Sequence, residues 1–148
     1  MQDFLDINLQ SALAGFVQDC REEAPAKDAD LKIWILARKD LDLSLGKFGP
    51  QAAHAAGTCM VISDRRDNSL VDDYLSQGQT KITVGVEDED DLRKHIELCR
   101  EAMLVTVLVQ DAGRTELEGK TVTLGAVGPC LRSDLPGPTK RLRAFRKE

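Results

Sequence analysis

Four short apolar runs, each rich in aliphatic side chains, recur along the chain with more polar intervals between them. They cover residues 31–37, 81–86, 103–109 and 121–127. Runs of this length and composition predict β-strands. The third run is the most hydrophobic and predicts a central strand that is buried on both faces. The interval between the third and fourth runs is too short for a helical crossover, so these two strands are expected to pair antiparallel or through an unusual loop.

Helical patterns occupy the intervals between these runs. Residues 45–60 begin with glycines and a proline and then become rich in alanine, which predicts a loop leading into a helix that ends before the polar run at residues 63–69. Residues 70–76 predict a short helix. The acidic cluster at residues 87–91 predicts the start of a further helix, because acidic side chains favour the N-terminal end of the helix dipole. Metal binding is the less favoured alternative for this cluster, since no turn glycine with further oxygen ligands follows it.

The first 30 residues have a pattern of their own. Residues 1–24 predict an amphipathic helix, or two short helices broken near Gly15, because their apolar positions recur every three or four residues. These positions are Phe4, Leu5, Leu9, Leu13, Phe16 and Val17. Residues 23–30 combine proline, small residues and charge, which is typical of a linker. We therefore expect an N-terminal helical extension and linker at residues 1–30 and a main domain at residues 31–148.

Strands that alternate with helices predict an α/β fold with a mostly parallel sheet. The 148 residues, of which 42% are hydrophobic and 30% charged, are typical of one soluble globular domain. No apolar run is long enough to predict a membrane span, and the N-terminus lacks the pattern of a secretory signal, so a cytoplasmic protein is expected. The four cysteines form no CxxC pair and predict reduced thiols in the core. His95 and Cys99, four residues apart, predict packing and not a metal pair, since no partner ligands lie nearby.

Candidate chemistry gathers in two places. Lys47, Gln51 and His54 would lie on one face of the predicted alanine-rich helix, where small neighbours let a substrate approach. The alternative is a surface helix with a lone core histidine. Asp111, with Arg114 and Thr115, closes the third apolar run, and the carboxyl ends of strands are where α/β sheets bind ligands.

These motifs and three others resemble the type-2 peptidyl-tRNA hydrolases of archaea and eukaryotes, in the same order and spacing over about residues 31–129. The matching residues are Arg38 to Leu41, Gly46-Lys47 with Gln51 and His54 to Ala56, Lys81 to Asp88, Asp111 to Thr115, and Gly128-Pro129. The resemblance implies a small mixed four-stranded sheet between two layers of helices. It also implies hydrolysis of the ester between a peptide and the 3′-terminal ribose of tRNA, without a metal or other cofactor.

The resemblance also implies roles for individual residues. It places catalytic functions on Lys47, His54, Asp111 and Thr115, and substrate binding on Gln51, Arg114, Arg38 and Asp40. Which residue is the general base stays open. For Arg38 and Asp40, a local ion pair that stabilises the loop is an equal alternative to substrate contact.

Two departures from the family pattern bear on activity. Ala52 and Ala53 replace the family's Cys-Ser, which removes a hydroxyl that could position water. Pro50 replaces a helix former and is expected to be compatible with the site only in the first helical turn. A non-catalytic member of the same fold that binds RNA or a protein is therefore the alternative function.

The net charge of −5 is unevenly distributed. Residues 1–30 carry seven acidic and two basic side chains, whereas residues 131–148 carry two acidic and six basic ones. The basic C-terminal tail, together with Arg65 and Arg66, could contact the phosphates of the tRNA acceptor end. The resemblance further implies a homodimer.

Overall fold

The computed structural model describes residues 30–111 and 121–146. The predicted N-terminal extension, as well as Arg114 and Thr115, lies outside the described residues. In chain order the elements are β1 (Leu31–Arg38), α2 (Leu45–Arg66), α3 (Asn68–Ser76), β2 (Lys81–Val86), α4 (Glu89–Glu101), β3 (Thr106–Asp111), β4 (Thr121–Leu131), the 3₁₀ turn η1 (Arg132–Asp134) and α5 (Gly137–Lys140).

The four strands form one mixed sheet in the order β2-β1-β4-β3. β1 and β2 pair parallel, while β4 pairs antiparallel with both β1 and β3. Three strands therefore run in one direction, and β4 is inserted against them. The predicted mixed sheet is confirmed, as is the antiparallel pairing of the last two strands that their short connection implied.

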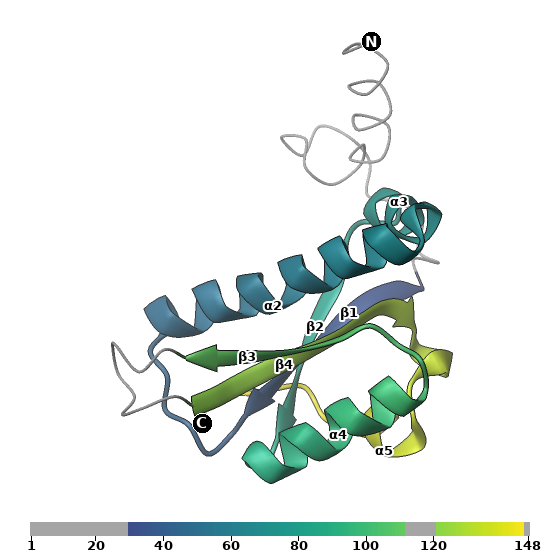
Figure 1. Cartoon of the computed structure of the whole chain (residues 1–148). Helices are drawn as coiled ribbons and strands as arrows, with labels where there is room; N and C mark the ends of the chain where they lie inside the picture. Colours follow the sequence, from purple (N-terminus) through teal and green to yellow (C-terminus); the bar gives the residue numbers. More distant parts are fainter. Residues whose placement is uncertain (1–29, 112–120, 147–148) are drawn as a thin grey trace.

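Helices cover both faces of the sheet, which confirms the three-layer α/β/α architecture. α2 and α3 lie on one face and α4 and α5 on the other (Figure 1). Alternation along β1 supplies both cores: Ile33 and Ile35 pack towards Cys59 and Tyr74, whereas Trp34 packs on the face covered by α4. The described cysteines, Cys59, Cys99 and Cys130, are buried free thiols, as predicted.

The prediction of a central third strand is wrong, because β3 is an edge strand. The chain before it, including the 84%-exposed Met103, lies outside the strand. Hydrophobicity along this run reflects packing against helices on both faces, with side chains contributed to both cores. Burial by helices and a central position in the sheet give the same sequence pattern, so the pattern alone does not separate them.

Two elements extend beyond their predicted ends. α2 continues through the polar run to Arg66, because these polar side chains lie mostly on its exposed side, and Asp67 then caps α3 by accepting hydrogen bonds from Ser69 and Leu70. β4 continues past Gly128 to Leu131. Gly128 has a φ of +120°, and a Cβ there would lie 2.6 Å from the carbonyl oxygen of Lys32, so only glycine fits.

The acidic cluster before α4 forms a helix cap, as predicted. The side chain of Asp88 accepts a hydrogen bond from the backbone N–H of Asp91, and the side chain of Asp91 accepts one from the N–H of Glu87. These two bonds satisfy donors that the helix start would otherwise leave without partners. No helix in the described ranges is long and apolar enough to cross a membrane.

The chain after α5 returns along the outer edge of β2. The backbone N–H of Gly85 donates to the carbonyl of Arg143, and the N–H of Phe145 donates to that of Thr83, with N···O distances of 3.0 and 2.9 Å. The ring of Phe145 stacks on Phe48 of α2, with centroids 5.6 Å apart and planes 5° from parallel. The end of the chain is thereby held beside the N-terminal turns of α2.

Candidate active site

A network of polar side chains joins α2 to the carboxyl end of β3. The ammonium group of Lys47 lies 2.7 Å from Oδ2 of Asp111, and Nε2 of Gln51 donates to the same oxygen over 2.9 Å. The carboxylate is almost fully buried, with 1% of the side chain exposed, whereas 23% of the Lys47 side chain is exposed. A positive charge is thus held at the surface by a negative charge beneath it.

The network continues to Thr123 on β4, a residue that the sequence analysis did not identify. Its hydroxyl donates to Oε1 of Gln51, and the side chains of both residues are buried. Because an ionised carboxylate only accepts hydrogen bonds, Asp111 fixes the Gln51 amide with Nε2 directed at it, which leaves Oε1 to accept from Thr123. The one available signal was a polar residue between the apolar Val122 and Leu124 of a core strand, and threonine is common in strands.

Pro50 does not disturb this arrangement. It is the sixth residue of α2, beyond the first turn, yet Lys47 and Gln51 on either side of it contact the same carboxylate oxygen. The expectation that a proline this deep would misalign them is therefore wrong. The carbonyl that loses its helical N–H partner is that of Gly46, an exposed residue in the first turn, where water can satisfy it.

Arg38 and Asp40 form a two-pronged ion pair at the carboxyl end of β1. Nε and Nη2 of Arg38 donate to the two carboxylate oxygens over 2.9 and 2.8 Å, and Nη1 donates to the carbonyl of Val122 over 2.7 Å. These hydrogen bonds lower the pKa of Asp40 and raise that of Arg38. The pair attaches the loop after β1 to β4, as expected of a local ion pair that stabilises the loop. Both side chains also line the adjoining cleft.

This cleft has a volume of about 620 Å³ and lies at the carboxyl end of β1. Its wall combines the loop after β1, the start of α2, Thr123 and the last described residues of the chain. The lining residues with large apolar side chains are Leu41, Leu43, Leu45, Phe48 and Phe145, and those with charged side chains are Arg38, Lys39, Asp40, Asp42 and Arg146. Thr123 connects the cleft to the network of Lys47, Gln51 and Asp111.

The predicted site residues are therefore only partly brought together. Lys47, Gln51 and Asp111 converge on one carboxylate oxygen. His54 lies one turn further along α2 with an exposed side chain, and it is not among the residues that line the cleft. Its predicted role, like those of Arg114 and Thr115, stays a prediction.

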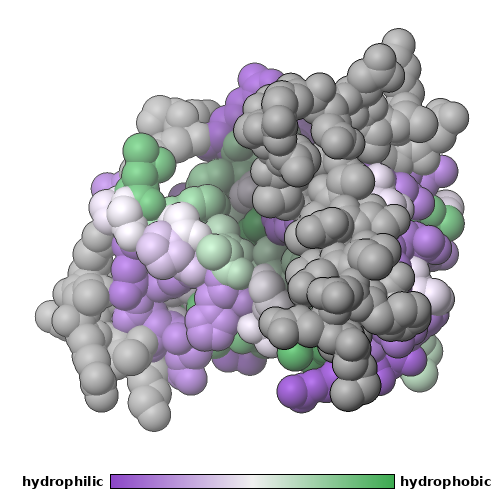
Figure 2. Space-filling view, turned by 90° about the horizontal axis from the view of Figure 1, so that it is seen from above, coloured by the Kyte–Doolittle hydropathy of each residue, from purple (hydrophilic) through white to green (hydrophobic). Residues whose placement is uncertain are grey.

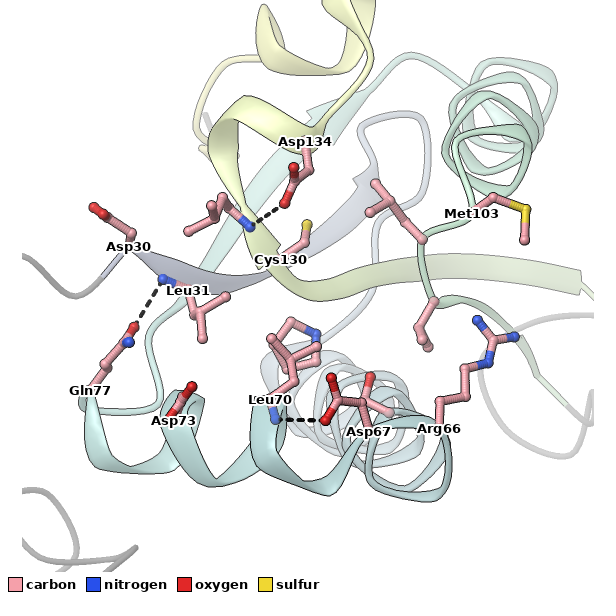
Figure 3. Close-up of a pocket in the computed structure, with 15 residues that line it drawn as sticks. Asp30, Leu31, Arg66, Asp67, Leu70, Asp73, Gln77, Met103, Cys130 and Asp134 are labelled. Carbon is pink, nitrogen blue, oxygen red and sulfur yellow. Dashed lines mark hydrogen bonds between the residues drawn. The ribbon is translucent and has the colours of Figure 1, made fainter.

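A second hollow of about 500 Å³ lies at the opposite end of the sheet, beside the start of β1 (Figure 3). Two of its polar side chains have structural partners: Gln77 accepts a hydrogen bond from the N–H of Leu31, and Asp134 accepts one from that of Leu131. The network of Lys47, Gln51 and Asp111 lies at the other end of the sheet, at the carboxyl end of β3.

His95 and Cys99 pack together, as predicted. Nδ1 of His95 lies 3.0 Å from Oγ1 of Thr139, and the thiol of Cys99 approaches the same oxygen. Burial lowers the pKa of His95 and raises that of Cys99. In residues 30–111 and 121–146, no group of three or more His, Cys, Asp or Glu side chains is arranged to hold a metal ion. Metal independence itself stays a prediction.

An ammonium group held over a buried carboxylate, at the edge of an open cleft, can stabilise the negative charge that develops in ester hydrolysis. On an α/β scaffold, these features are suited to a hydrolytic enzyme. Comparison with known proteins gives a more specific assignment. Residues 31–145 match the family model described as peptidyl-tRNA hydrolase PTH2, and the chain belongs to this family.

Archaeal relatives support this assignment. A peptidyl-tRNA hydrolase of Sulfurisphaera tokodaii is 39% identical over 102 residues, which are 66% of this chain and 84% of that protein. One of Halobacterium salinarum is 37% identical over 115 residues, covering 78% of this chain and 100% of the relative. One of Thermoplasma acidophilum is 37% identical over 98 residues, or 66% of this chain and 84% of the relative. The predicted family and hydrolase class are thus confirmed, and the non-catalytic alternative is not favoured.

Proposed function

We propose that Lys47 and Asp111 form the catalytic centre for hydrolysis of the ester between a peptide and the 3′-terminal ribose of tRNA. The contact of 2.7 Å between their charged groups, beside the cleft, is the observation that carries this proposal. In the reaction, water adds to the ester carbonyl, the bond to the ribose oxygen breaks, and the peptide acid and the free 3′-hydroxyl result. A tetrahedral oxyanion forms on the way.

Each member of the network has a separate task in this proposal. Lys47, the partly exposed member, stabilises the oxyanion. Asp111 holds the ammonium group in place through their ion pair, and Gln51, which also bonds to Thr123, holds the carboxylate in place. Thr115 retains its predicted catalytic role, as a hydrogen-bonding partner of the water or the substrate. A preorganised charge of this kind contributes on the order of 10²- to 10³-fold to kcat.

The test is release of peptide from N-blocked aminoacyl-tRNA, with free aminoacyl-tRNA as the control substrate. We expect turnover of the blocked substrate, and a loss of at least about 100-fold in kcat for Lys47→Met. His54→Ala is the informative companion, because His54 was also predicted to be catalytic and its imidazole is exposed. Near-normal turnover by Lys47→Met would place the chemistry elsewhere, and a large loss in His54→Ala alone would assign it to the histidine.

For the tRNA acceptor end, we propose contacts with the basic residues near the end of the chain. Arg141 and Arg143 line a hollow next to the cleft, and Arg146 lines both. Phosphate contacts make the affinity for tRNA fall as the salt concentration rises. Replacing Arg141 and Arg143 with Gln should make the slope of log affinity against log salt shallower, by an amount that corresponds to about two phosphate contacts. Replacing Arg65 and Arg66, which lie about 27 Å further along α2 from Lys47, tests the second predicted contact in the same way. An unchanged slope in either variant would argue against contact by that pair.

We further propose a homodimer in the cytoplasm, the compartment where peptidyl-tRNA arises. The outward side of α2 carries the exposed Ala53, Gly57 and Val61 at intervals of four residues. Figure 2 looks onto the molecule from above, where green and pale areas lie next to purple ones outside the grey atoms. A low apolar stripe allows close packing of a second helix. Light scattering tests this: we expect twice the chain mass, and a return to single-chain mass for Val61→Lys.

A further inference from the structure

We propose that the stacked pair Phe48 and Phe145 is a platform for the base of the substrate's 3′-terminal nucleotide, adenine in tRNA. This inference rests on the proposed function and names the part of the substrate that the cleft recognises. The ring pair lines the cleft together with Thr123, whose hydroxyl joins the cleft to the network of Lys47 through Gln51. Both rings are half-buried and line the cleft, so part of each faces its interior.

The position of Phe145 is fixed by the backbone. Its N–H donates to Thr83, and the bond between Gly85 and Arg143 holds the preceding residues against β2. The planes of the two rings are 5° from parallel, so Phe48 of α2 and Phe145 form one aromatic stack. A base placed against such a stack gains face-to-face contact, which supports single-stranded nucleic acid binding with little dependence on hydrogen bonds.

Other residues that line the cleft are suited to a nucleotide and are not needed for the protein core. Leu45 is 82% exposed at the start of α2, where an apolar side chain contributes little to folding. Arg146, next to Phe145, is exposed on the same cleft and offers positive charge to a phosphate. A volume of about 620 Å³ lies within the range of small-molecule sites.

The occupant could in principle be the peptide end of the substrate instead. The peptide differs from one substrate molecule to the next, whereas the terminal nucleotide is the same in all of them. A rigid aromatic wall of fixed geometry suits the constant part, because a fixed shape gives no advantage with variable side chains. The apolar and aromatic lining together with Arg146 therefore favours the base.

The experiment compares two minimal esters of one N-blocked amino acid, one on a terminal adenosine and the other on a terminal ribose without a base. For the unmodified full-length chain, we expect kcat/KM to be about tenfold higher with the base present, mainly through KM. Phe145→Leu should lose this preference, whereas Phe145→Tyr, which keeps the ring, should retain it. All three proteins should hydrolyse the ester without a base at equal rates.

The outcomes separate this inference from the proposed function. Hydrolysis of both esters at equal rates by the unmodified chain, or an undiminished preference in Phe145→Leu, would overturn the platform and leave the enzyme intact. No hydrolysis of either ester would overturn both. An equal loss on both esters in Phe145→Leu would overturn the platform and assign the ring pair to the peptide end, which the two esters share. If Phe145→Leu does not fold, Phe48→Leu makes the same test from the other ring.

Discussion

Replacing Lys47 with methionine should lower the stability of the fold as well as the rate of the reaction. The substitution removes the cation beside the carboxylate of Asp111, of which 1% is exposed, while keeping most of the side-chain length. Opposite charges 2.7 Å apart attract by about 6 kcal/mol at an effective dielectric constant of about 20. Loss of one partner of a fully buried pair typically costs about 3–5 kcal/mol, because the other charge stays buried.

Two features reduce this cost. Lys47 retains 23% exposure, so water already screens the pair, and Gln51 continues to donate to the same oxygen. We therefore expect Lys47→Met to lower the free energy of unfolding by about 2–3 kcal/mol. Asp111→Asn should cost less, about 1 kcal/mol, because the released ammonium group can reach water. Both variants should lose at least about 100-fold in kcat.

Urea denaturation followed by circular dichroism measures the stability difference, and Lys94→Met is the matched control. Lys94 is exposed on α4, and its replacement should change the free energy of unfolding by less than about 0.5 kcal/mol. If Lys47→Met unfolds at the same urea concentration as this control, the buried carboxylate of Asp111 is not stabilised by the charge of Lys47. A larger cost for Asp111→Asn than for Lys47→Met would also refute the reasoning.

Three further predictions concern other parts of the molecule. Thr123→Val should lower the free energy of unfolding by about 1–3 kcal/mol and lower kcat, because it leaves the buried carbonyl of Gln51 without its donor. Thr106→Val on β3 is the control and should change neither quantity, as measured by urea denaturation and peptide release. Burial lowers the pKa of His95, so on acidification this histidine is protonated in the unfolded chain before it is protonated in the folded one. Melting temperatures should therefore fall as the pH drops below about 6.5, and they should fall less in His95→Gln. A chain that begins at Asp30 should keep both its melting transition and its hydrolysis, because the described core and site are formed by later residues; loss of either would give residues 1–29 a part in the domain.

Sequence alone determined the four strands, the capped start of α4 and the placement of Lys47 and Gln51 on one face of a helix. Strand and helix periodicities report which side chains are buried, and the acidic cap of α4 acts within a few residues of itself. A residue that ends a strand and one that opens the next helix meet at the same edge of a sheet. These are local rules, so the sequence carries them directly.

Only the tertiary structure decided the features that depend on distant neighbours. β3 is an edge strand although it is highly apolar, because helices bury it from both sides. Lys47 looks like an exposed helix lysine in the sequence, and it becomes part of a buried network only because β3 places Asp111 beneath it. The contact of Thr123 with Gln51 and the stacking of Phe145 on Phe48 join residues far apart in the chain. No local pattern encodes such contacts, because the sheet order and the path of the last residues along β2 create them.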